Sequence, residues 1–475
     1  MKPDIVFYQQ YALPYFGILS LNAYLKHAGF KADVVIKSLE KDPIRTIKRL
    51  NPSIVGISVL STEHNWLIYA TQAMRSAMPH VKIIVGGIHA IFYPEEILSV
   101  TSADLVCHSE GEDVLLNVIK ELNKSNPSWH SIPGISYRDN SGVIHTNERA
   151  TLVQFDDKIV EDRAIYYDRY PPLAKDIVHR FFSSRGCPYR CSFCYNPVIK
   201  DFFKGKGKYE RQKSVELFIQ EIYSQCTKYS IKLVFFYDDL FTFDKKWLKR
   251  FLEIYKIKVN IPFMCTTRAD LIDDDTSRML AEAGCRTASF GIETGNYQIR
   301  KNILKKDISD EQIMRCGDLL HKYGIRIQTS NMFCLPNETL EDAYKTVELN
   351  IKSKANFAFS ALFMPFPKME IADYCIKQGF LKPDYSLKDL PYSFLTASIL
   401  NMPNKAAIVN IHRLVYFFVR WPLFFRIFRK IVRLYFLNIF FRLIFLISNL
   451  LRYKEERGIT LPSAIQYALR LRNSF

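Results

Sequence analysis

The sequence has no fourth cysteine close to Cys187, Cys191 and Cys194, which follow a C-x-x-x-C-x-x-C spacing; the next cysteine is Cys226. Thiolates are soft ligands that select iron–sulfur clusters, zinc or copper. Extended chain spans only about 3.5 Å per residue, so all three sulfurs can reach one small inorganic group. A ferredoxin-type cluster takes four thiolates. Three would leave one iron open to an exogenous ligand, as catalytic zinc sites keep one position open.

Two alternatives to a cluster follow from the same residues. A zinc site requires a fourth protein ligand nearby, and the nearest histidine upstream is His179, with none following closely. Buried cysteines can also serve only for packing. Gly186 permits a tight bend before the first cysteine, and Pro188 biases Cys187 toward an extended conformation, which suits a ligand loop.

The sequence also lacks a secretion signal at its start and has few acidic residues after residue 410. Met1-Lys2-Pro3-Asp4 does not begin a secretory signal, and the other seven cysteines are scattered singly, so we expect a cytoplasmic chain with reduced thiols. Residues 411–475 hold 12 Lys or Arg and two Asp or Glu, which supplies +10 of the formal net charge of +17. The basic charge therefore belongs to an apolar tail, whose phenylalanines exceed what nucleic-acid stacking needs.

A length of 475 residues and an apolar content of 48% predict two or three domains with sizeable cores. In the first part, apolar runs alternate with helical patterns, a sign of a doubly wound parallel sheet of flavodoxin-like or Rossmann-like type. The runs are 4–8, 32–36, 54–59, 81–85 and 104–107, and the helical patterns include 64–78 and 113–122. We assign residues 1–124 to this α/β domain and residues 125–178 to a linker with a hairpin at 135–137 and 143–145. The first run lacks a following G-x-G-x-x-G, so a dinucleotide site has little support.

Residues 179–400 repeat a strand–helix pattern. The expected strands are 180–184, 233–237, 263–266, 287–292, 325–333 and 357–364, with helices between them. Ser309 and Gln312 form a capping-box pattern at the start of one helix. Six units do not close an eight-stranded barrel, so we predict a partial (β/α)6 barrel with its site at the carboxyl ends of the strands.

Residues 401–475 form a basic, aromatic tail. Arg426, Arg429, Lys430 and Arg433 would fall on one side of a helix, which predicts an amphipathic helix lying in a membrane interface. The stretch 434–451 approaches spanning length, but Arg442 at its middle makes a span costly. The alternative is a helical lid packed on the barrel.

The cysteine loop, with the aromatic Phe193 before its last cysteine, resembles the signature loop of the radical SAM superfamily. The resemblance implies a [4Fe–4S] cluster on Cys187, Cys191 and Cys194, with S-adenosylmethionine (SAM) on the open iron and Phe193 against its adenine. One electron then cleaves SAM to a 5′-deoxyadenosyl radical. The resemblance implies that Glu293, in a G-x-E-x-G stretch with Gly291 and Gly295, binds the ribose or methionine end of SAM. Arg268 is a candidate for the SAM carboxylate, because a guanidinium pairs with carboxylates, and Ser330 and Asn331 are weaker candidates.

The stretches GGIHAIFYPEEIL and HSEGED resemble the cobalamin-binding domain that precedes many radical SAM domains. The implied cofactor contacts are Ser58, Gly86, Gly87, His89, Glu110 and Gly111. Relatives of the histidine-ligated type carry D-x-H-x-x-G after the first strand, whereas Tyr8–Tyr15 contains no histidine. If cobalamin binds, we therefore predict no histidine ligand on cobalt. The alternative is a domain with this fold and no corrinoid.

Together these resemblances, over residues 4–380, imply a cobalamin-dependent radical SAM enzyme, similar to methylases of unactivated carbon and anaerobic magnesium-protoporphyrin ester cyclases. We expect it to methylate a hydrophobic or membrane-associated small molecule, to take electrons from a flavodoxin- or ferredoxin-type donor, and to lie in the cytoplasm or on the inner membrane face. Nucleic acid is not an expected partner. The alternatives are radical cyclisation, oxidation or rearrangement without methyl transfer, and an iron–sulfur or corrinoid-binding sensor. A methylthiotransferase is disfavoured because only Cys107 precedes residue 187.

Overall fold

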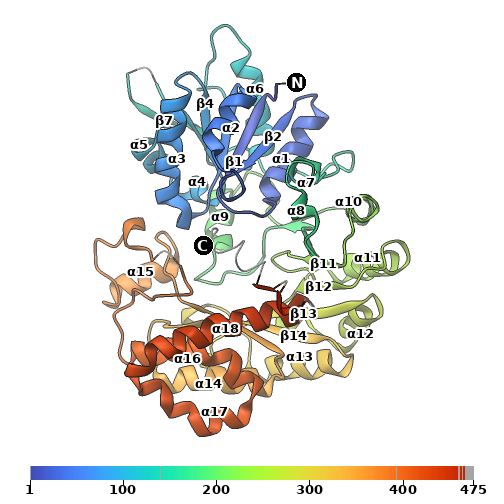
Figure 1. The fold of residues 1–475 in the computed structure, drawn as a ribbon, viewed down its shortest axis with the longest axis vertical. Helices are drawn as coiled ribbons and strands as arrows, with labels where there is room; N and C mark the ends of the chain where they lie inside the picture. The colour runs from blue at the N-terminus through green and yellow to red at the C-terminus, as the bar shows by residue number, and fades with distance from the viewer. Residues whose placement is uncertain (1, 140, 392, 458–459, 463, 466–475) are drawn as a thin grey trace. The chain divides into compact units, whose positions relative to one another are not determined.

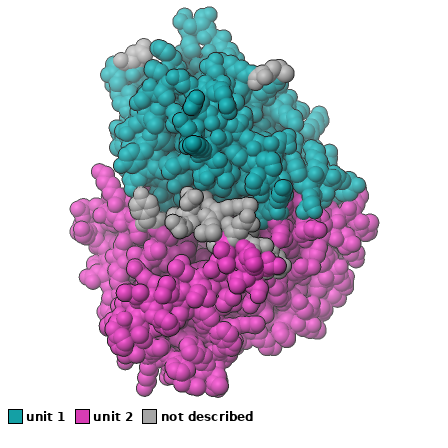
Figure 2. Space-filling view, in the orientation of Figure 1, with its two compact units in different colours: residues 1–176, 199–230, 470–475 teal, residues 177–198, 231–469 magenta. Residues whose placement is uncertain are grey.

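The computed structural model describes all residues except 1, 140, 392, 458–459, 463 and 466–475. The chain divides into two compact units, coloured separately in Figure 2. Of the described residues, the first unit contains those in 2–176 and 199–230, and the second contains those in 177–198 and 231–465. Each unit is described on its own.

The first unit is built on a seven-stranded sheet with the order β2-β1-β3-β4-β5-β6-β7. Its strands are β1 (Ile5–Gln9), β2 (Ala32–Ile36), β3 (Ile54–Ser58), β4 (Lys82–Gly86), β5 (Leu105–Cys107), β6 (Ile135–Arg138) and β7 (Ile144–Thr146). The first five are parallel, and β1 is buried at every position because both faces of the sheet are covered. Ile5 and Phe7 enter one core while Val6 and Tyr8 enter the other, as strand alternation requires.

Helices connect these strands in Figure 1. They are α1 (Phe16–His27), α2 (Pro43–Leu50), α3 (His64–Ala77), α4 (Ile88–Phe92), α5 (Pro94–Val100), α6 (Gly111–Leu122), α7 (Ala164–Tyr167) and α8 (Pro171–Ala174). The predicted doubly wound sheet is confirmed. The hairpin that we expected in a linker is instead paired antiparallel with β5, because Cys107, Val106 and Leu105 face Ile135, Ser136 and Tyr137 in register.

The structure also groups residues 199–230, with α10 (Val215–Lys228), with the first unit, whereas we had assigned them to one continuous barrel domain. A buried ion cluster accounts for this placement. The Lys213 ammonium lies 3.2 Å from Glu161 and 2.6 Å from Glu221, and its side chain is only 5% exposed. The Arg211 guanidinium likewise pairs with Glu110 at 2.6 Å.

The second unit is a half-barrel of six parallel strands in the order β15-β14-β13-β12-β11-β8. The strands are β8 (Val178–Phe181), β11 (Leu233–Phe236), β12 (Phe263–Thr266), β13 (Cys285–Glu293), β14 (Arg326–Phe333) and β15 (Phe357–Leu362). The helices between them are α11 (Lys245–Lys258), α12 (Asp274–Glu282), α13 (Asp310–Lys322), α14 (Leu340–Lys352) and α15 (Glu370–Lys377). The partial barrel and the Ser309–Gln312 capping box are both confirmed.

The tail differs from the single amphipathic helix that we expected. It folds into α16 (Lys405–Arg420), α17 (Pro422–Phe428), two short 3-10 segments at Arg429–Arg433 and Tyr435–Leu437, and α18 (Asn438–Arg457). Pro422 opens α17, and Trp421 before it is non-helical (φ −127°, ψ 85°), because a residue preceding proline avoids the helical region. Arg426 therefore lies in a different element from Arg429, Lys430 and Arg433.

Helices α17 and α18 both pack on α16, which lies beside α14 in Figure 1. Helix α16 packs on β15 and α14, with the Ser360 hydroxyl 2.8 Å from Nδ1 of the fully buried His412. The lid alternative thus describes α16. The stretch Tyr435–Glu456 has a mean hydropathy of 1.4 over its most apolar window, and is long and apolar enough to cross a membrane by length and composition alone.

Candidate active site

The three-cysteine loop leaves the end of β8 and is held by backbone and side-chain hydrogen bonds. Gly186 has a φ of +86°, the left-handed conformation that the predicted bend requires. Before the loop, the Asp238 carboxylate accepts hydrogen bonds from the Ser183 amide (2.9 Å) and the Ser183 hydroxyl (2.8 Å). Within the loop, the Ser192 amide and hydroxyl donate to the carbonyls of Leu304 (3.0 Å) and Ile303 (2.6 Å). The loop is therefore fixed before the first thiol and between the second and the third.

The three thiols are half-buried and close enough to influence one another electrostatically. Burial raises the pKa of Cys187 to about 12, with further contributions from Asp239, Cys194 and Cys191. Burial also raises the pKa of Cys194 to about 11. For Cys191 burial again raises the pKa, against the opposing effect of Lys306 and Arg268. Metal binding must therefore displace protons from these thiols.

The donor set fits a cluster better than a single ion. Among the described residues, no group of three or more His, Cys, Asp or Glu side chains is arranged to hold one metal ion. A zinc ion needs its four ligands at roughly 2 Å from one centre, whereas cluster thiolates bind to different irons.

Asn196 is a contact of the third cysteine that the sequence analysis missed. Its side-chain amide lies 3.7 Å from the Cys194 sulfur and 3.1 Å from an oxygen of Asp239. Burial raises the pKa of Asp239, and the Asn196 hydrogen bond opposes that rise. The Asn196 amide therefore lies within hydrogen-bonding distance of the third thiol of the motif. Its position two residues after the motif was the only signal in the sequence.

Glu293 stands at the carboxyl end of β13 in an unusual backbone conformation. Its φ is +67°, and the pairing with β14 shifts register between Gly291 and Glu293. The Lys306 ammonium donates to Glu293 at 2.7 Å and to the Gly291 carbonyl at 2.8 Å, and both side chains are 9% exposed. A Cβ on Gly291 would lie 1.9 Å from the Glu293 carboxylate. Gly291 thus makes room for this ion pair, and Lys306 is a second residue that sequence analysis missed.

Gly295 is required by packing against α14. A Cβ there would lie 2.2 Å from the Lys345 carbonyl carbon and 2.3 Å from the Thr346 nitrogen, and the Gly295 amide donates to the Thr346 hydroxyl at 2.8 Å. Gly295 therefore fixes the backbone two residues after Glu293 against α14.

Arg268 follows β12 and is buried, with 7% exposure. Its Nε donates to Asp270 at 2.8 and 3.2 Å, and its guanidinium lies 3.8 Å from the Tyr189 ring centroid. The guanidinium also lowers the pKa of the Cys191 thiol through charge and a hydrogen bond. Arg268 thus joins the cysteine loop to the end of β12, although Asp270 occupies its Nε.

Ser330 and Asn331, adjacent on β14, face opposite ways. Ser330 is half-buried and in register with Gly291 on β13, near the Glu293 turn. Asn331 is 1% exposed, and its amide donates to the Phe359 carbonyl (3.0 Å) while its oxygen accepts from Asn350 (2.7 Å). Only Ser330 remains on the face that carries Gly291.

Phe193 is half-buried in the cysteine loop.

In the first unit, the loops after β3 and β4 approach each other closely at Gly87. Gly87 has a φ of +91°, and a Cβ there would lie 2.7 Å from the Val59 carbonyl and 3.0 Å from the Ser58 hydroxyl. Gly86 ends β4 opposite Ser58, with space for a Cβ. Only glycine at position 87 permits this close approach between the backbones of the two loops.

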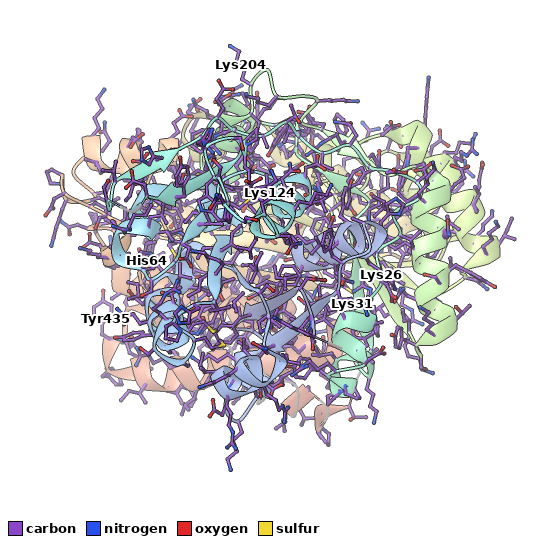
Figure 3. The ribbon with its side chains drawn as sticks, turned by 90° about the horizontal axis from the view of Figure 1, so that it is seen from above. Lys26, Lys31, His64, Lys124, Lys204 and Tyr435 are labelled. Carbon is purple, nitrogen blue, oxygen red and sulfur yellow. The ribbon has the colours of Figure 1, made fainter. Side chains whose placement is uncertain are left out.

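His89 is engaged inside this unit. Its Nε2 lies 3.0 Å from Nδ1 of His64, which Figure 3 labels, and its Nδ1 lies 3.2 Å from the Ser61 hydroxyl. Both ring nitrogens are therefore occupied and the side chain is fully buried. His108 is also buried, and burial lowers its pKa. An orienting role suits His89 better than metal ligation.

Glu110 and Gly111 open α6. Glu110 pairs with Arg211 and accepts a hydrogen bond from the Val153 amide at 2.8 Å. A Cβ on Gly111 would lie 3.0 Å from Leu21 of α1. In this structure both residues hold the first unit together.

Comparison with known families identifies both units. Residues 181–349 match the radical SAM superfamily and residues 5–119 match the B12 binding domain. The chain is a radical SAM enzyme with a B12 binding domain. The cofactors expected from the sequence, a [4Fe–4S] cluster, SAM and cobalamin, are confirmed for these two domains.

Relatives and solved structures agree with this family. The chain is 27% identical to an uncharacterized methyltransferase of Pyrococcus horikoshii, over 72% of this chain and 73% of the relative. It is 25% identical to the anaerobic magnesium-protoporphyrin IX monomethyl ester cyclase of Rubrivivax gelatinosus, over 76% and 68%. Its fold resembles the radical SAM methyltransferase TsrM of Kitasatospora setae, solved with cobalamin and a [4Fe–4S] cluster, with a TM-score of 0.65, 17% identity and coverage of 79% and 75%. The radical SAM B12 enzyme thus resembles cobalamin-dependent methyltransferases.

Proposed function

We propose that this radical SAM B12 enzyme methylates an unactivated carbon of a hydrophobic small molecule. The observation that carries the proposal is the set of three half-buried thiols on the loop after β8, which lie close enough to raise one another's pKa. A B12 binding domain in the same chain, and relatives named methyltransferases, favour methyl transfer.

When bound, the cluster supplies the electron that cleaves SAM and the corrinoid carries the methyl group. In the second unit, Cys187, Cys191 and Cys194 would hold the cluster, with Phe193 beside the adenine. Glu293 would bind the ribose or methionine end of SAM, since a carboxylate accepts hydrogen bonds from hydroxyl and amino groups. Its pairing with Lys306 fixes the carboxylate before the ligand arrives.

Three further residues complete the proposed SAM site. Arg268 would attract the SAM carboxylate, because a guanidinium pairs with carboxylates. Ser330 would add a hydroxyl from the neighbouring strand, and Asn196 would tune the third thiolate.

In the first unit we propose a corrinoid held by the loops at Ser58, Gly86 and Gly87. The cobalt would carry no histidine, because both ring nitrogens of His89 contact protein groups and Tyr8–Tyr15 offers none. A base-off spectrum that is unchanged in a His89→Gln variant would agree with this assignment. We further propose a cytoplasmic protein that takes electrons from a flavodoxin- or ferredoxin-type donor.

Cysteine variants test the cluster assignment. Cys187→Ala, Cys191→Ala and Cys194→Ala should each abolish 5′-deoxyadenosine formation from SAM in the reconstituted, reduced protein. The matched control is Cys226→Ala, a half-buried cysteine on α10, which should retain it. Deoxyadenosine formed at the control's rate by any of the three variants would exclude the proposal.

A second candidate is radical cyclisation or oxidation without methyl transfer, favoured by the likeness to the ester cyclase. SAM labelled in its methyl group separates the two. Label in the product supports methyl transfer, and product with only its own carbons supports the second candidate.

A further inference from the structure

The second unit carries an exposed apolar face formed by α17, the segment Tyr435–Leu437 and α18, which we call the tail face. Twelve large apolar side chains between residues 421 and 447 are exposed. Phe436 is 80% exposed, Ile439 76% and Leu423 69%. Tyr435, which Figure 3 labels at the outer edge of its view, is 50% exposed. Apolar surface of this extent marks an interaction site.

Charge indicates what covers the tail face. The sequence contains no Asp or Glu from residue 390 to residue 454, whereas it has ten Lys or Arg in the same stretch. Arg426, Lys430, Arg433 and Arg442 are exposed among the apolar side chains. Long cationic side chains beside exposed aromatic and aliphatic ones complement anionic headgroups above acyl chains.

The opposite side of α18 is fixed to the protein. Phe441 and Ser448 are buried, at 1% and 4% exposure. The Asn438 side chain accepts a hydrogen bond from the buried Asn410 of α16 at 2.8 Å, and the Phe445 ring centroid lies 4.7 Å from that of His412. A span would break these contacts and take Arg442 into the hydrocarbon, so α18 is suited to lie along a surface.

The carboxyl end of α18 reaches the half-barrel strands. The Arg452 guanidinium lies 5.0 Å from the Phe359 ring centroid, and the Arg326 guanidinium donates to the Glu455 carbonyl at 3.0 Å. Phe359 is in register with Ser330, one of the proposed site residues on β14. Helix α18 therefore joins the tail face to the strands that carry the candidate site.

We propose that the tail face binds the surface of an anionic phospholipid bilayer, with α18 parallel to the membrane plane, so that the enzyme takes a membrane-resident substrate. Membrane docking narrows the substrate class of the proposed function to membrane-resident molecules. It rests on the proposed function only for the identity of the substrate. Vesicle binding needs no turnover, so its failure is distinct from failure of the proposed chemistry.

Flotation of the full-length reconstituted protein with vesicles tests the docking surface. Phosphatidylglycerol–phosphatidylcholine vesicles should carry the protein at low salt, and pure phosphatidylcholine vesicles should carry much less. Binding should fall steeply as salt screens the charges. Removal of one surface charge, as in Lys430→Gln, should weaken binding about fivefold at low salt.

The apolar contribution is tested by Phe436→Ser combined with Ile439→Ser, which should reduce vesicle binding at least tenfold. The matched control is Ile257→Ser on α11, which is comparably exposed at 79% but lies outside the tail face. Deoxyadenosine formation by the double variant in vesicle-free buffer should equal that of the parent, which separates docking from catalysis.

Three results would overturn the inference. One is no flotation with anionic vesicles at low salt. Another is flotation that the double variant and Ile257→Ser affect equally. The third is a stable dimer in sedimentation equilibrium that the double variant dissociates, because the tail face would then bind a second copy.

Discussion

At the scale of single residues, Lys306 is the side chain whose loss we expect to matter most outside the thiols. It neutralises Glu293, and both side chains are 9% exposed. Lys306→Met would leave a buried carboxylate without its partner, which costs about 3 kcal/mol in unfolding free energy. Urea denaturation of the purified protein measures this loss, and SAM affinity should fall with it.

Lys305 is the matched control for that prediction. Lys305 directly precedes Lys306 in the chain and pairs with Glu370. Unlike the buried pair, these two side chains are 50% and 57% exposed. Exposed pairs contribute less than about 1 kcal/mol, so Lys305→Met should change stability little. Equal effects of the two substitutions would contradict the role given to Lys306.

The pair of Glu293 and Lys306 shows which part of the site could be predicted from the sequence and which could not. Glu293 could be named because it stands between two glycines at a strand end. Lys306 is thirteen positions later, beyond the π-helical turn Ile299–Ile303, and no periodicity links the two residues. Side-chain partners that meet only after the chain has turned back leave no local pattern, and the pairing of Asn196 with Asp239, 43 positions later, was missed for the same reason.

At the scale of elements, strand prediction succeeded where apolar runs were bounded by polar turns. Residues 32–36 and 263–266 match β2 and β12 in full. The prediction of a single tail helix was wrong, because a high density of apolar residues does not show where one helix ends and the next begins. Pro422 was the available signal, and it marks the start of α17.

Helix α14 gives an element-scale prediction at Gly295. Gly295→Ala would place a methyl group against the backbone at Lys345 and Thr346, which neither side can relieve by rotating a side chain. We expect a loss of about 3 kcal/mol in unfolding free energy, measured by urea denaturation. Gly17→Ala is the control: it lies in α1 with open space around it and should stabilise the protein by about 0.5 kcal/mol. A neutral Gly295→Ala would show that α14 can move away.

The turn before α14 predicts a pH dependence. Burial raises the pKa of Glu338 from 4.5 to about 8, and its Oε1 has no hydrogen-bond partner among the described residues. Between pH 5 and 8 the unfolded chain releases this proton while the folded chain keeps it, so stability falls as pH rises through that window. Glu338→Gln should remove about 4 kcal/mol of that fall, seen as Tm against pH.

The exposed Glu341, in the first turn of α14, serves as the control for Glu338. Glu341→Gln should leave the curve of Tm against pH parallel to that of the parent. If Glu338→Gln also gave a parallel curve, the buried carboxyl would not be protonated in the folded state.

At the scale of the whole molecule, two separate segments of the chain, 2–176 and 199–230, build the first unit. Arg211 tests whether the second segment stabilises the sheet formed by the first. Its side chain is 3% exposed and its two terminal nitrogens lie 2.6 and 2.7 Å from Glu110. Arg211→Ala should destabilise the first unit by about 3 kcal/mol. Hydrogen exchange should accelerate in β1 to β5 and remain unchanged in β13 and β14.

Lys204 is exposed in the same segment and provides the control; Figure 3 labels it at the outer edge of its view. Lys204→Ala should leave exchange unchanged everywhere. Acceleration confined to residues 199–230 in Arg211→Ala would show that this segment folds apart from the sheet. The placement of residues 199–230 in the first unit could not be predicted from the sequence, because ion pairs between residues about a hundred positions apart leave no periodic pattern.

The order in which the parts of the second unit are synthesised affects when a cluster can be inserted. The thiols are synthesised by residue 194, whereas the last half-barrel strand ends at Leu362, which is 362 − 194 = 168 residues later. At bacterial or eukaryotic synthesis rates this interval lasts about 10 to 30 s. Any machinery that delivers iron and sulfide must therefore act on a nearly complete or released polypeptide, since the nascent chain has no finished sheet to receive them.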